Sequence, residues 1–196
     1  MPMELLPLWG TWLNWRRVFS VEPLDYAKSF PELFGSGLGK LVGIEAQFYV
    51  DKTVTPRCFK PRSVPFALRS KVEAELERLV AEGVLRPVEF SEWAAPIVPV
   101  LKPNGDVRIC GDYKLTINAA AKLDDYPIPR IEDLYAELTG GVLYSKLDLS
   151  NAYQQVCLHE DSQKFTTITT SRGLFMYTRL CYGLASAPGI FQRIME

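Results

Sequence analysis

A carboxylate at the end of an apolar run is the first group in this sequence that could do chemistry. In LDLSNAYQQV, residues 147–156, Asp148 is followed by a polar turn and then by Tyr153. Alternation of apolar and polar residues predicts a strand over residues 142–149, with Asp148 on its less apolar face at the carboxyl end. Clefts often open at such an end, so the carboxylate could meet a ligand. It could equally cap its own strand through a local hydrogen bond.

Two cations lie in a second segment that could do chemistry. In IVPVLKPNGDVRIC, residues 97–110, two apolar runs flank Asn104-Gly105. This dipeptide predicts a hairpin because both residues tolerate positive φ. Lys102 and Arg108 then lie near the tip, where they would suit a clamp on an anionic ligand. Ordinary surface charge is the alternative, and the segment taken alone favours it.

The elements that must position these groups follow from periodicity and turn signals. A helix is predicted from about Pro65 to Glu82 and a second over about Ile131–Leu138, each followed by glycine. Residues 165–170 and 174–180 predict another hairpin, and Ser186 is predicted to cap a final helix. Pro99 and Pro103 place the first strand of the 97–110 hairpin at a sheet edge or a bulge, because proline donates no ladder hydrogen bond.

The segment from Thr53 to Val72 is basic and contains no acidic residue. Its cations are Arg57, Lys60, Arg62, Arg69 and Lys71. Such a run is typical either of a solvated extended arm or of one that contacts phosphates, and the sequence leaves both open. The preceding residues 1–50 lack a sustained period and are predicted to be a leader or linker, which leaves 51–196 as the folded domain.

Composition sets the class of protein. The 196 residues are 47% hydrophobic and 23% charged, with a formal net charge of -1, which is typical of a globular protein and excludes a uniformly basic surface. Four widely spaced cysteines and one histidine give no zinc-binding pattern. A signal peptide and an apolar stretch long enough to cross a membrane are absent. We therefore expect an intracellular protein, cytoplasmic or nuclear, that does not associate with membranes.

The order of the segments resembles the reverse transcriptase of gypsy-type LTR retrotransposons. SEWAAPIVPVLKPNGDVRICGDYK, DDYPIPRIEDL, KLDLSNAYQQV and FTTITTSRGLFMYTRLCYGLASAPGIFQ occur in the order of that family, from about Phe34 to Glu196. PLWGTWLNW is more weakly similar to the end of the aspartic protease that precedes such a polymerase. The resemblance implies an α+β fold, the fingers and first half of the palm of a right-hand polymerase, with an antiparallel sheet and packed helices.

The resemblance also implies roles for particular residues. Asp148 matches the first of three catalytic carboxylates that hold two Mg²⁺ ions, with Leu149 lending a backbone carbonyl to the metal. The residues that match a nucleotide-binding role are Lys102, Arg108, Leu149, Tyr153, Tyr182 and Gly183. Tyr153 would pack under the incoming sugar and disfavour a ribose, and Lys102 and Arg108 would close on the triphosphate. Lys114 matches a template-side residue, and Arg57, Lys60 and Arg62 are the other candidates for nucleic-acid contact. The implied partners are an RNA or DNA template-primer and dNTP.

The sequence departs from the family pattern at three places. Cys181 stands where LPFG has proline, and Gly189 stands where SAPA has alanine. The aromatic-x-Asp-Asp motif that carries the other two carboxylates does not occur. We therefore expect part of an RNA-directed DNA polymerase that is inactive alone, from a parent that also carries ribonuclease H. The alternative hypothesis is a non-catalytic, nucleic-acid-binding remnant of a retroelement.

Overall fold

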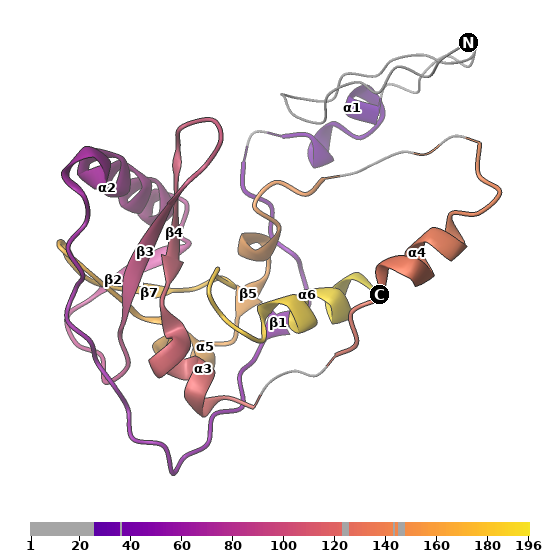
Figure 1. Ribbon diagram of the computed structural model, residues 1–196. Helices are drawn as coiled ribbons and strands as arrows, with labels where there is room; N and C mark the ends of the chain where they lie inside the picture. The colour runs from indigo at the N-terminus through magenta and orange to yellow at the C-terminus, as the bar shows by residue number, and fades with distance from the viewer. Residues whose placement is uncertain (1–25, 36, 123–125, 143, 145–147) are drawn as a thin grey trace. The chain divides into compact units, whose positions relative to one another are not determined.

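The computed structural model describes residues 26–35, 37–122, 126–142, 144 and 148–196 (Figure 1). The chain divides into two compact units, residues 1–37 and 38–196. The described part of the first unit holds a short helix, α1 (Tyr26–Ser29), and a 3₁₀ turn, η1 (Pro31–Leu33). Residues 38–50, which the sequence assigns to a leader, contribute strand β1 (Glu45–Ala46) and the buried residues Ala46 and Phe48 to the second unit.

Five strands of the described chain form one sheet in the second unit. They are β2 (Leu85–Val88), β3 (Ala95–Leu101), β4 (Val107–Gly111), β6 (Ile168–Thr170) and β7 (Gly173–Tyr177). Their order is β2-β7-β6-β3-β4, and β3 runs parallel to β6 whereas the other neighbours are antiparallel. The sheet is therefore mostly antiparallel, as the resemblance implies, with one parallel pair. The α+β class is confirmed.

Both predicted hairpins form. In the β3–β4 hairpin the backbone N–H of Lys102 donates to the carbonyl of Asp106 at 2.8 Å, so the loop has three residues. Gly105 has φ +86°, whereas Asn104 does not adopt positive φ, so the expected two-residue turn is wrong. Pro99 lies in the part of β3 that pairs with β4 but not with β6. Its missing N–H therefore costs the sheet no hydrogen bond. The second hairpin joins β6 to β7 at Thr170 and Gly173.

Helix α2 (Phe66–Ala81) confirms the predicted helix to within a residue at each end. Val72, Leu76 and Leu79 are buried, and Gly83 has φ +68° just beyond the helix. Burying each such side chain stabilises the fold by about 1.5–3 kcal/mol, far more than helix propensity contributes. In Figure 1 α2 lies beside the β3–β4 hairpin, and the Nζ of Lys71 donates a 2.7 Å hydrogen bond to the carbonyl of Gly105 at the hairpin tip.

Shorter elements complete the second unit around the same core. Strand β1 pairs in parallel with β5 (Cys157–Leu158). The remaining elements are η2 (Tyr113–Leu115), α3 (Ile117–Ala120), η3 (Ala152–Gln155), α5 (Glu160–Gln163), η4 (Lys164–Thr166) and α6 (Ala187–Met195). Helix α6 begins where Ser186 predicts, but the hydroxyl of Ser186 makes no capping hydrogen bond and is buried instead.

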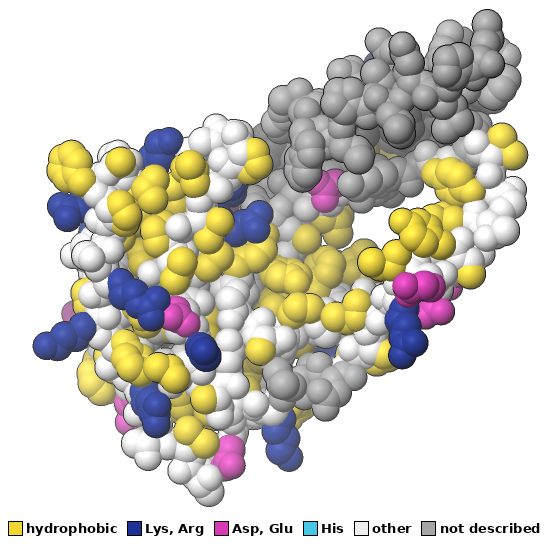
Figure 2. All heavy atoms as spheres, in the orientation of Figure 1, with side chains coloured by type: hydrophobic (Ala, Val, Ile, Leu, Met, Phe, Trp, Pro, Cys, Tyr) yellow, Lys and Arg dark blue, Asp and Glu magenta, His cyan; other side chains and the backbone are white. Residues whose placement is uncertain are grey.

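Helix α4 (Ile131–Glu137) forms as predicted, but it differs from α2 because none of its residues is buried. Ile131, Leu134 and Tyr135 are exposed, and Figure 2 shows hydrophobic side chains at the surface of this helix. Gly140, with φ +88°, follows it. The helix is therefore maintained by local signals, including the two acidic residues in its first turn.

The strand predicted over residues 142–149 does not form in the described residues of that stretch. Residues 143 and 145–147 lie outside the described residues, and Val142, Tyr144, Asp148 and Leu149 are not in a strand. The hydroxyl of Tyr144 donates instead to the carbonyls of Leu138 and Gly141, which turns the chain back toward α4. Alternation alone does not make a strand without a neighbouring backbone, and no described strand pairs with this stretch. Within the described ranges, no helix has the length and apolar character needed to cross a membrane.

Candidate functional site

Three predicted nucleotide-binding residues from distant parts of the sequence form a stack. The guanidinium carbon of Arg108, on β4, lies 4.3 Å from the ring centroid of Tyr182. The ring of Tyr182 lies 5.2 Å from that of Tyr153, in η3, and Tyr153 meets Phe191 of α6 edge-on at 5.4 Å. Burial raises the pKa of Tyr153, and the neighbouring Tyr182 adds to this effect. Phe191 carries no family-specific signal, and the sequence did not point to it.

The turn that presents Tyr153 depends on Asn151. Asn151 has φ +48°, a left-handed conformation that asparagine adopts more readily than most residues. Its carbonyl accepts from the backbone N–H of Gln154 at 2.8 Å, which starts η3 and directs Tyr153 toward Tyr182. The polar turn that follows Asp148 in the sequence is thus the element that places the aromatic ring.

The loop that carries Tyr182 touches the end of β4. The backbone N–H of Gly111 donates to the carbonyl of Tyr182 at 3.3 Å. Gly183 has φ +100°, and a Cβ at this position would lie 2.1 Å from the carbonyl oxygen of Gly111. A side chain at position 183 would therefore be strained and would collide with backbone. Glycine here is required by geometry, which gives a physical reason for the aromatic-Gly step.

The β3–β4 hairpin presents its two cations differently. Val107 and Ile109 are buried, so the alternation of β4 turns Arg108 to the opposite, exposed face. Val98 and Val100 of β3, which pair with Cys110 and Arg108, are partly exposed on the same face. Lys102 is half-buried at the start of the loop. Arg108 is held over Tyr182, so the two cations differ in their surroundings, and their role as a clamp stays a prediction.

Asp148 and Leu149 are both exposed to solvent. No described residue donates a hydrogen bond to the carboxylate of Asp148, so the local cap considered from the sequence is not seen. Among the described residues there is also no group of three or more His, Cys, Asp or Glu side chains that could hold a metal ion. Asp148 with one backbone carbonyl does not fit a site for two Mg²⁺ ions, although proteins of this kind generally use that metal.

The basic arm is fixed along part of its length. The backbone N–H of Ala94 donates to the carbonyl of Arg57 at 3.0 Å, and the N–H of Phe59 donates to the carbonyl of Ala94 at 2.9 Å. The Arg57 and Lys60 side chains remain exposed, as does Lys114 on η2. Arg62 instead forms an ion pair with Asp112 at 2.5 Å. Of the candidate nucleic-acid contacts, Arg62 is the one whose charge is matched by another residue in the part of the chain that the structure describes.

A buried polar network lies behind the stack. The thiol of Cys181 donates to the hydroxyl of Tyr113 at 3.4 Å, and that hydroxyl donates to the carbonyl of Thr166 at 2.8 Å. Burial raises the pKa of Cys181 to about 12, and it also raises the pKa values of Tyr113 and Tyr177 well above the ordinary value for tyrosine. These groups stay neutral and structural near pH 7. Cys181, at the position of the family's proline, thus holds the loop through side-chain contacts.

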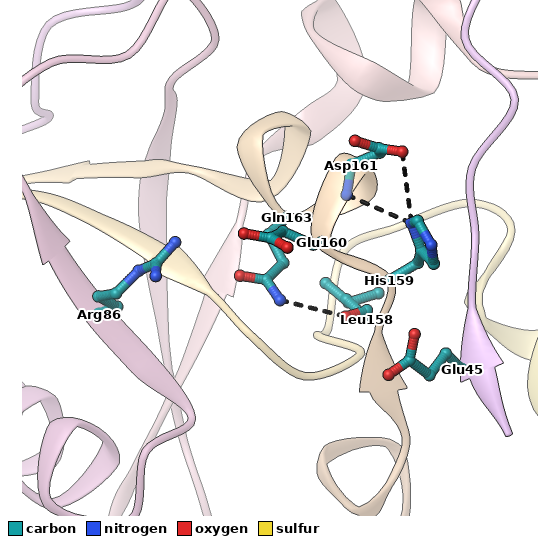
Figure 3. Close-up of a pocket in the computed structure, with 7 residues that line it drawn as sticks. All are labelled: Glu45, Arg86, Leu158, His159, Glu160, Asp161 and Gln163. Atoms are coloured by element: carbon teal, nitrogen blue, oxygen red, sulfur yellow. Dashed lines mark hydrogen bonds and ion pairs between the residues drawn. The ribbon is translucent and has the colours of Figure 1, made fainter. Parts of the chain in front are cut away.

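A polar pocket of about 430 Å³ is lined by none of the predicted site residues (Figure 3). Glu45, Arg86, His159 and Asp161 contribute to its walls. The Nδ1 of His159 accepts a hydrogen bond from the backbone N–H of Asp161 at 3.3 Å and so caps the short helix α5. This accounts for the single histidine as a structural residue, and we assign the pocket no role.

Comparison with protein families identifies the chain. Residues 100–196 match the family described as reverse transcriptase (RNA-dependent DNA polymerase). This range contains β4, the loop of Tyr182 and the stacked rings. The chain carries part of a reverse transcriptase of the LTR-retrotransposon type. The family expected from the sequence motifs is therefore confirmed.

Relatives of this reverse transcriptase segment are much longer proteins. An uncharacterized protein of Caenorhabditis elegans, K02A2.6, is 43% identical over 169 residues, which cover 85% of this chain and 13% of that protein. The retrovirus-related Pol polyprotein from transposon opus of Drosophila melanogaster is 31% identical over 176 residues, which cover 85% of this chain and 17% of the polyprotein. The chain thus spans less than a fifth of the length of either relative.

Solved structures show the same fold at low sequence identity. A foamy viral protease-reverse transcriptase in complex with double-stranded DNA superposes with a TM-score of 0.72 at 23% identity, covering 86% of this chain and 30% of that one. The foamy viral protease-reverse transcriptase in complex with an RNA/DNA hybrid gives a TM-score of 0.69 at 22% identity, covering 87% and 23%. The fold of this chain is therefore similar to that of part of these protease-reverse transcriptases.

Proposed function

We propose that this chain supplies the fingers and the first part of the palm of an RNA-directed DNA polymerase, and that it contributes the surface on which an incoming dNTP is held. The template-primer would be RNA or DNA, as in the foamy viral complexes. The chain covers a small share of its relatives, so the complete reaction belongs to a longer protein.

The observation that carries this proposal is the stack of Arg108 on Tyr182 on Tyr153. Arg108 precedes Tyr182 by 74 positions in the sequence and Tyr153 precedes it by 29, yet the three side chains lie within contact distance. A guanidinium binds the oxygens of a phosphate in a planar, bidentate manner. The ring of Tyr153, which packs against Tyr182, would exclude a ribose 2′-hydroxyl by its bulk. We assign Lys102, Leu149 and Gly183 to the same nucleotide surface.

We propose Asp148 as the catalytic carboxylate of this segment. Its exposure leaves it accessible to Mg²⁺ in a complete polymerase domain, with the Leu149 carbonyl as a second oxygen ligand. The described residues do not form that site by themselves, since they offer one carboxylate where a two-ion site requires several. We therefore expect the 196-residue chain alone to show no primer extension with Mg²⁺ or Mn²⁺.

The proposal is tested by joining residues 1–196 to the downstream polymerase segment of a complete relative. In this chimera Asp148→Asn should abolish DNA synthesis and leave template binding largely intact, because a ligand that acts in the chemical step affects turnover more than binding. Tyr153→Ala should retain synthesis and incorporate ribonucleotides more readily, because it removes a steric barrier. Primer extension with dNTP and with rNTP measures both effects.

Two exposed residues of α4 provide matched controls. Asp133→Asn and Tyr135→Ala make the same chemical changes outside the stack, and both should behave as the parent chimera does. Near-normal synthesis by Asp148→Asn, or unchanged sugar selectivity in Tyr153→Ala, would contradict the assignment of these residues.

A second candidate function is nucleic-acid binding without catalysis, favoured by the exposed cations Arg57, Lys60 and Lys114. Contacts to phosphates release counterions, so binding should weaken steeply between about 50 and 200 mM salt. Replacing all three residues by alanine should flatten that dependence, whereas Lys52→Ala, an exposed lysine outside the predicted contacts, should leave it unchanged. Affinity that is independent of salt would argue against this function.

A further inference from the structure

We propose that Asn118 is a positioning residue that fixes the Tyr182-Gly183 step and thereby sets how well the site distinguishes deoxyribose from ribose. Neither the family match nor the sequence motifs assign a role to this residue. The predicted effect on sugar selectivity rests on the proposed function. The positioning of the Tyr182-Gly183 step by Asn118 rests only on contacts within the chain.

Asn118 uses both ends of its side-chain amide on the loop that carries Tyr182. Its Nδ2 donates to the carbonyl of Gly183 at 2.8 Å, and its Oδ1 accepts from the backbone N–H of Ala185 at 2.9 Å. A side chain that donates to one residue and accepts from another two positions later replaces the pairing that a neighbouring strand would give. Asn118 therefore clamps a loop that has no regular secondary structure over residues 181–185.

The clamp is presented from a firm base. Asn118 belongs to α3, in which Ile117 and Ala120 are buried in the core. Thr116, the residue immediately before α3, is also buried. Its hydroxyl donates to the carbonyl of Tyr113 at 3.3 Å. Because α3 is anchored on both sides of Asn118, the side-chain amide has a nearly fixed position. The loop that bonds to it is therefore held in that position.

The other contacts of Tyr182 hold its backbone at one point and its ring between two neighbours. The hydrogen bond from the Gly111 N–H holds the Tyr182 carbonyl. The next residue, Gly183, has φ +100° and no Cβ to restrict its backbone conformation. The ring is held by the Arg108 guanidinium and by the Tyr153 ring, and each of these contacts is weak by itself. Weak ring contacts fix a ring in one position when its backbone is already held in place.

It follows that releasing Asn118 should shift Tyr182 and, with it, Tyr153. Tyr153 is the ring proposed to exclude a ribose 2′-hydroxyl, and Tyr182 is one of its two aromatic neighbours. Asn118 would not touch the nucleotide. It would act on sugar selectivity through the position of these rings, which a residue needed merely for folding would not do selectively.

The experiment uses the full 196-residue chain with isotope-labelled tyrosine and backbone amides, observed by NMR. Asn118→Ala removes both bonds, so exchange of the Ala185 amide should accelerate on the order of tenfold or more, as expected for lost neutral hydrogen bonds. The ring signals of Tyr182 and Tyr153 should shift. Asn118→Asp keeps the acceptor for Ala185 and loses the donor to Gly183, so it should protect the Ala185 amide while still shifting the rings.

The same samples are titrated with dATP and with ATP. The preference for dATP should fall by roughly threefold to tenfold in Asn118→Ala, on the scale of one or two weakened contacts. Gln163→Ala is the matched control, because the Gln163 amide also donates to a backbone carbonyl, that of Leu158 at 3.2 Å, and lies outside the loop. It should leave the ring signals and the preference unchanged.

The outcomes separate the clamp from the proposed function. Ring signals and Ala185 exchange that are unchanged in Asn118→Ala would overturn the clamp, whatever the nucleotide data show. Shifted rings with an unchanged preference for dATP would overturn the link to sugar selectivity. A wild-type chain that binds dATP and ATP equally, with no effect of Arg108→Ala or Tyr153→Ala, would contradict the proposed function while the ring signals still decided the clamp.

Discussion

Two helices that the sequence predicts differ in how far their side chains are buried. Helix α2 buries Val72, Leu76 and Leu79 against the sheet, whereas α4 buries no residue and leaves Leu134 and Tyr135 exposed. We refer to the sheet, α2 and the 181–185 loop as the interlocked region, and to residues 126–149 as the α4 segment. The contrast shows that a helical pattern predicts a helix, but that long-range burial decides whether the helix contributes to stability.

The largest difference should come from truncating one leucine in each helix. Leu76→Ala should lower the free energy of unfolding by about 2–5 kcal/mol, because it removes buried contacts and leaves a cavity. Leu134→Ala removes the same atoms from an exposed side chain and should change it by less than about 0.5 kcal/mol. Urea unfolding followed by circular dichroism measures both values. Equal losses would show that α4 is packed against the protein in solution.

Glycines sharpen the same comparison. Gly183→Ala should cost roughly 2–4 kcal/mol, because it combines a strained backbone with an overlap against the Gly111 carbonyl. Gly140 has a similar φ of +88° but nothing near its Cβ position, so Gly140→Ala adds strain alone and should affect α4 rather than global unfolding. Thermal denaturation compares the two variants. A tolerated alanine at position 183 would mean that the loop separates from β4.

Alkaline pH should weaken the interlocked region. The pKa of Cys181 rises from an ordinary 9.0 to about 12 on folding, so between these values the unfolded chain loses a proton that the folded chain retains. The resulting contribution of Cys181 to the free energy of unfolding is fully present below pH 9. It declines by about 1.4 kcal/mol per pH unit as the pH rises from 9 toward 12. Tyr113 and Tyr177 act in the same direction.

The contribution of Cys181 can be isolated by mutation. Cys181→Ala should reduce the slope of unfolding free energy against pH in the window from 9 to 12, and Cys58→Ala, at an exposed thiol, should not change it. Urea unfolding at closely spaced pH values gives the slope. An identical slope in Cys181→Ala would show that the thiol is not buried in solution.

The smallest effect is expected at the surface ion pair between Arg62 and Asp112. Because Arg62 is more than half exposed, Arg62→Ala should change the free energy of unfolding by less than about 1 kcal/mol. Its effect on nucleic-acid binding should also be weaker than that of Arg57→Ala, since Asp112 already offsets its charge. Binding measured at several salt concentrations compares the two. A larger loss with Arg62→Ala would mean that the pair opens to release the arginine.

The sequence predicted the elements that depend on nearby residues. The bounds of α2, the two hairpins and the start of α6 follow from apolar spacing, glycine and proline, all of which act within a few positions. The strand expected over 142–149 is not seen in the described residues of that stretch, because a strand requires a partner and alternation in one segment does not supply it. The same limit explains why the parallel pairing of β3 with β6 was not foreseen.

The candidate site was predicted in its residue types but not in its contacts. Motif resemblance named Arg108, Tyr153 and Tyr182, whereas their stacking and the participation of Phe191 emerged from the fold. Asn118 is 65 positions from Gly183, and nothing local distinguishes it from an ordinary polar residue of a short helix. Lys71 likewise bonds to the distant carbonyl of Gly105 and not to a glutamate one turn away.

The contact between Gly183 and Gly111 also bears on how copies of such a gene change over time. Position 183 accepts no side chain without moving the end of β4, so drift there cannot be absorbed by a neighbouring substitution. Exposed positions of α4, by contrast, can vary freely. Among related copies, glycine at position 183 should therefore vary less than the exposed residues of α4.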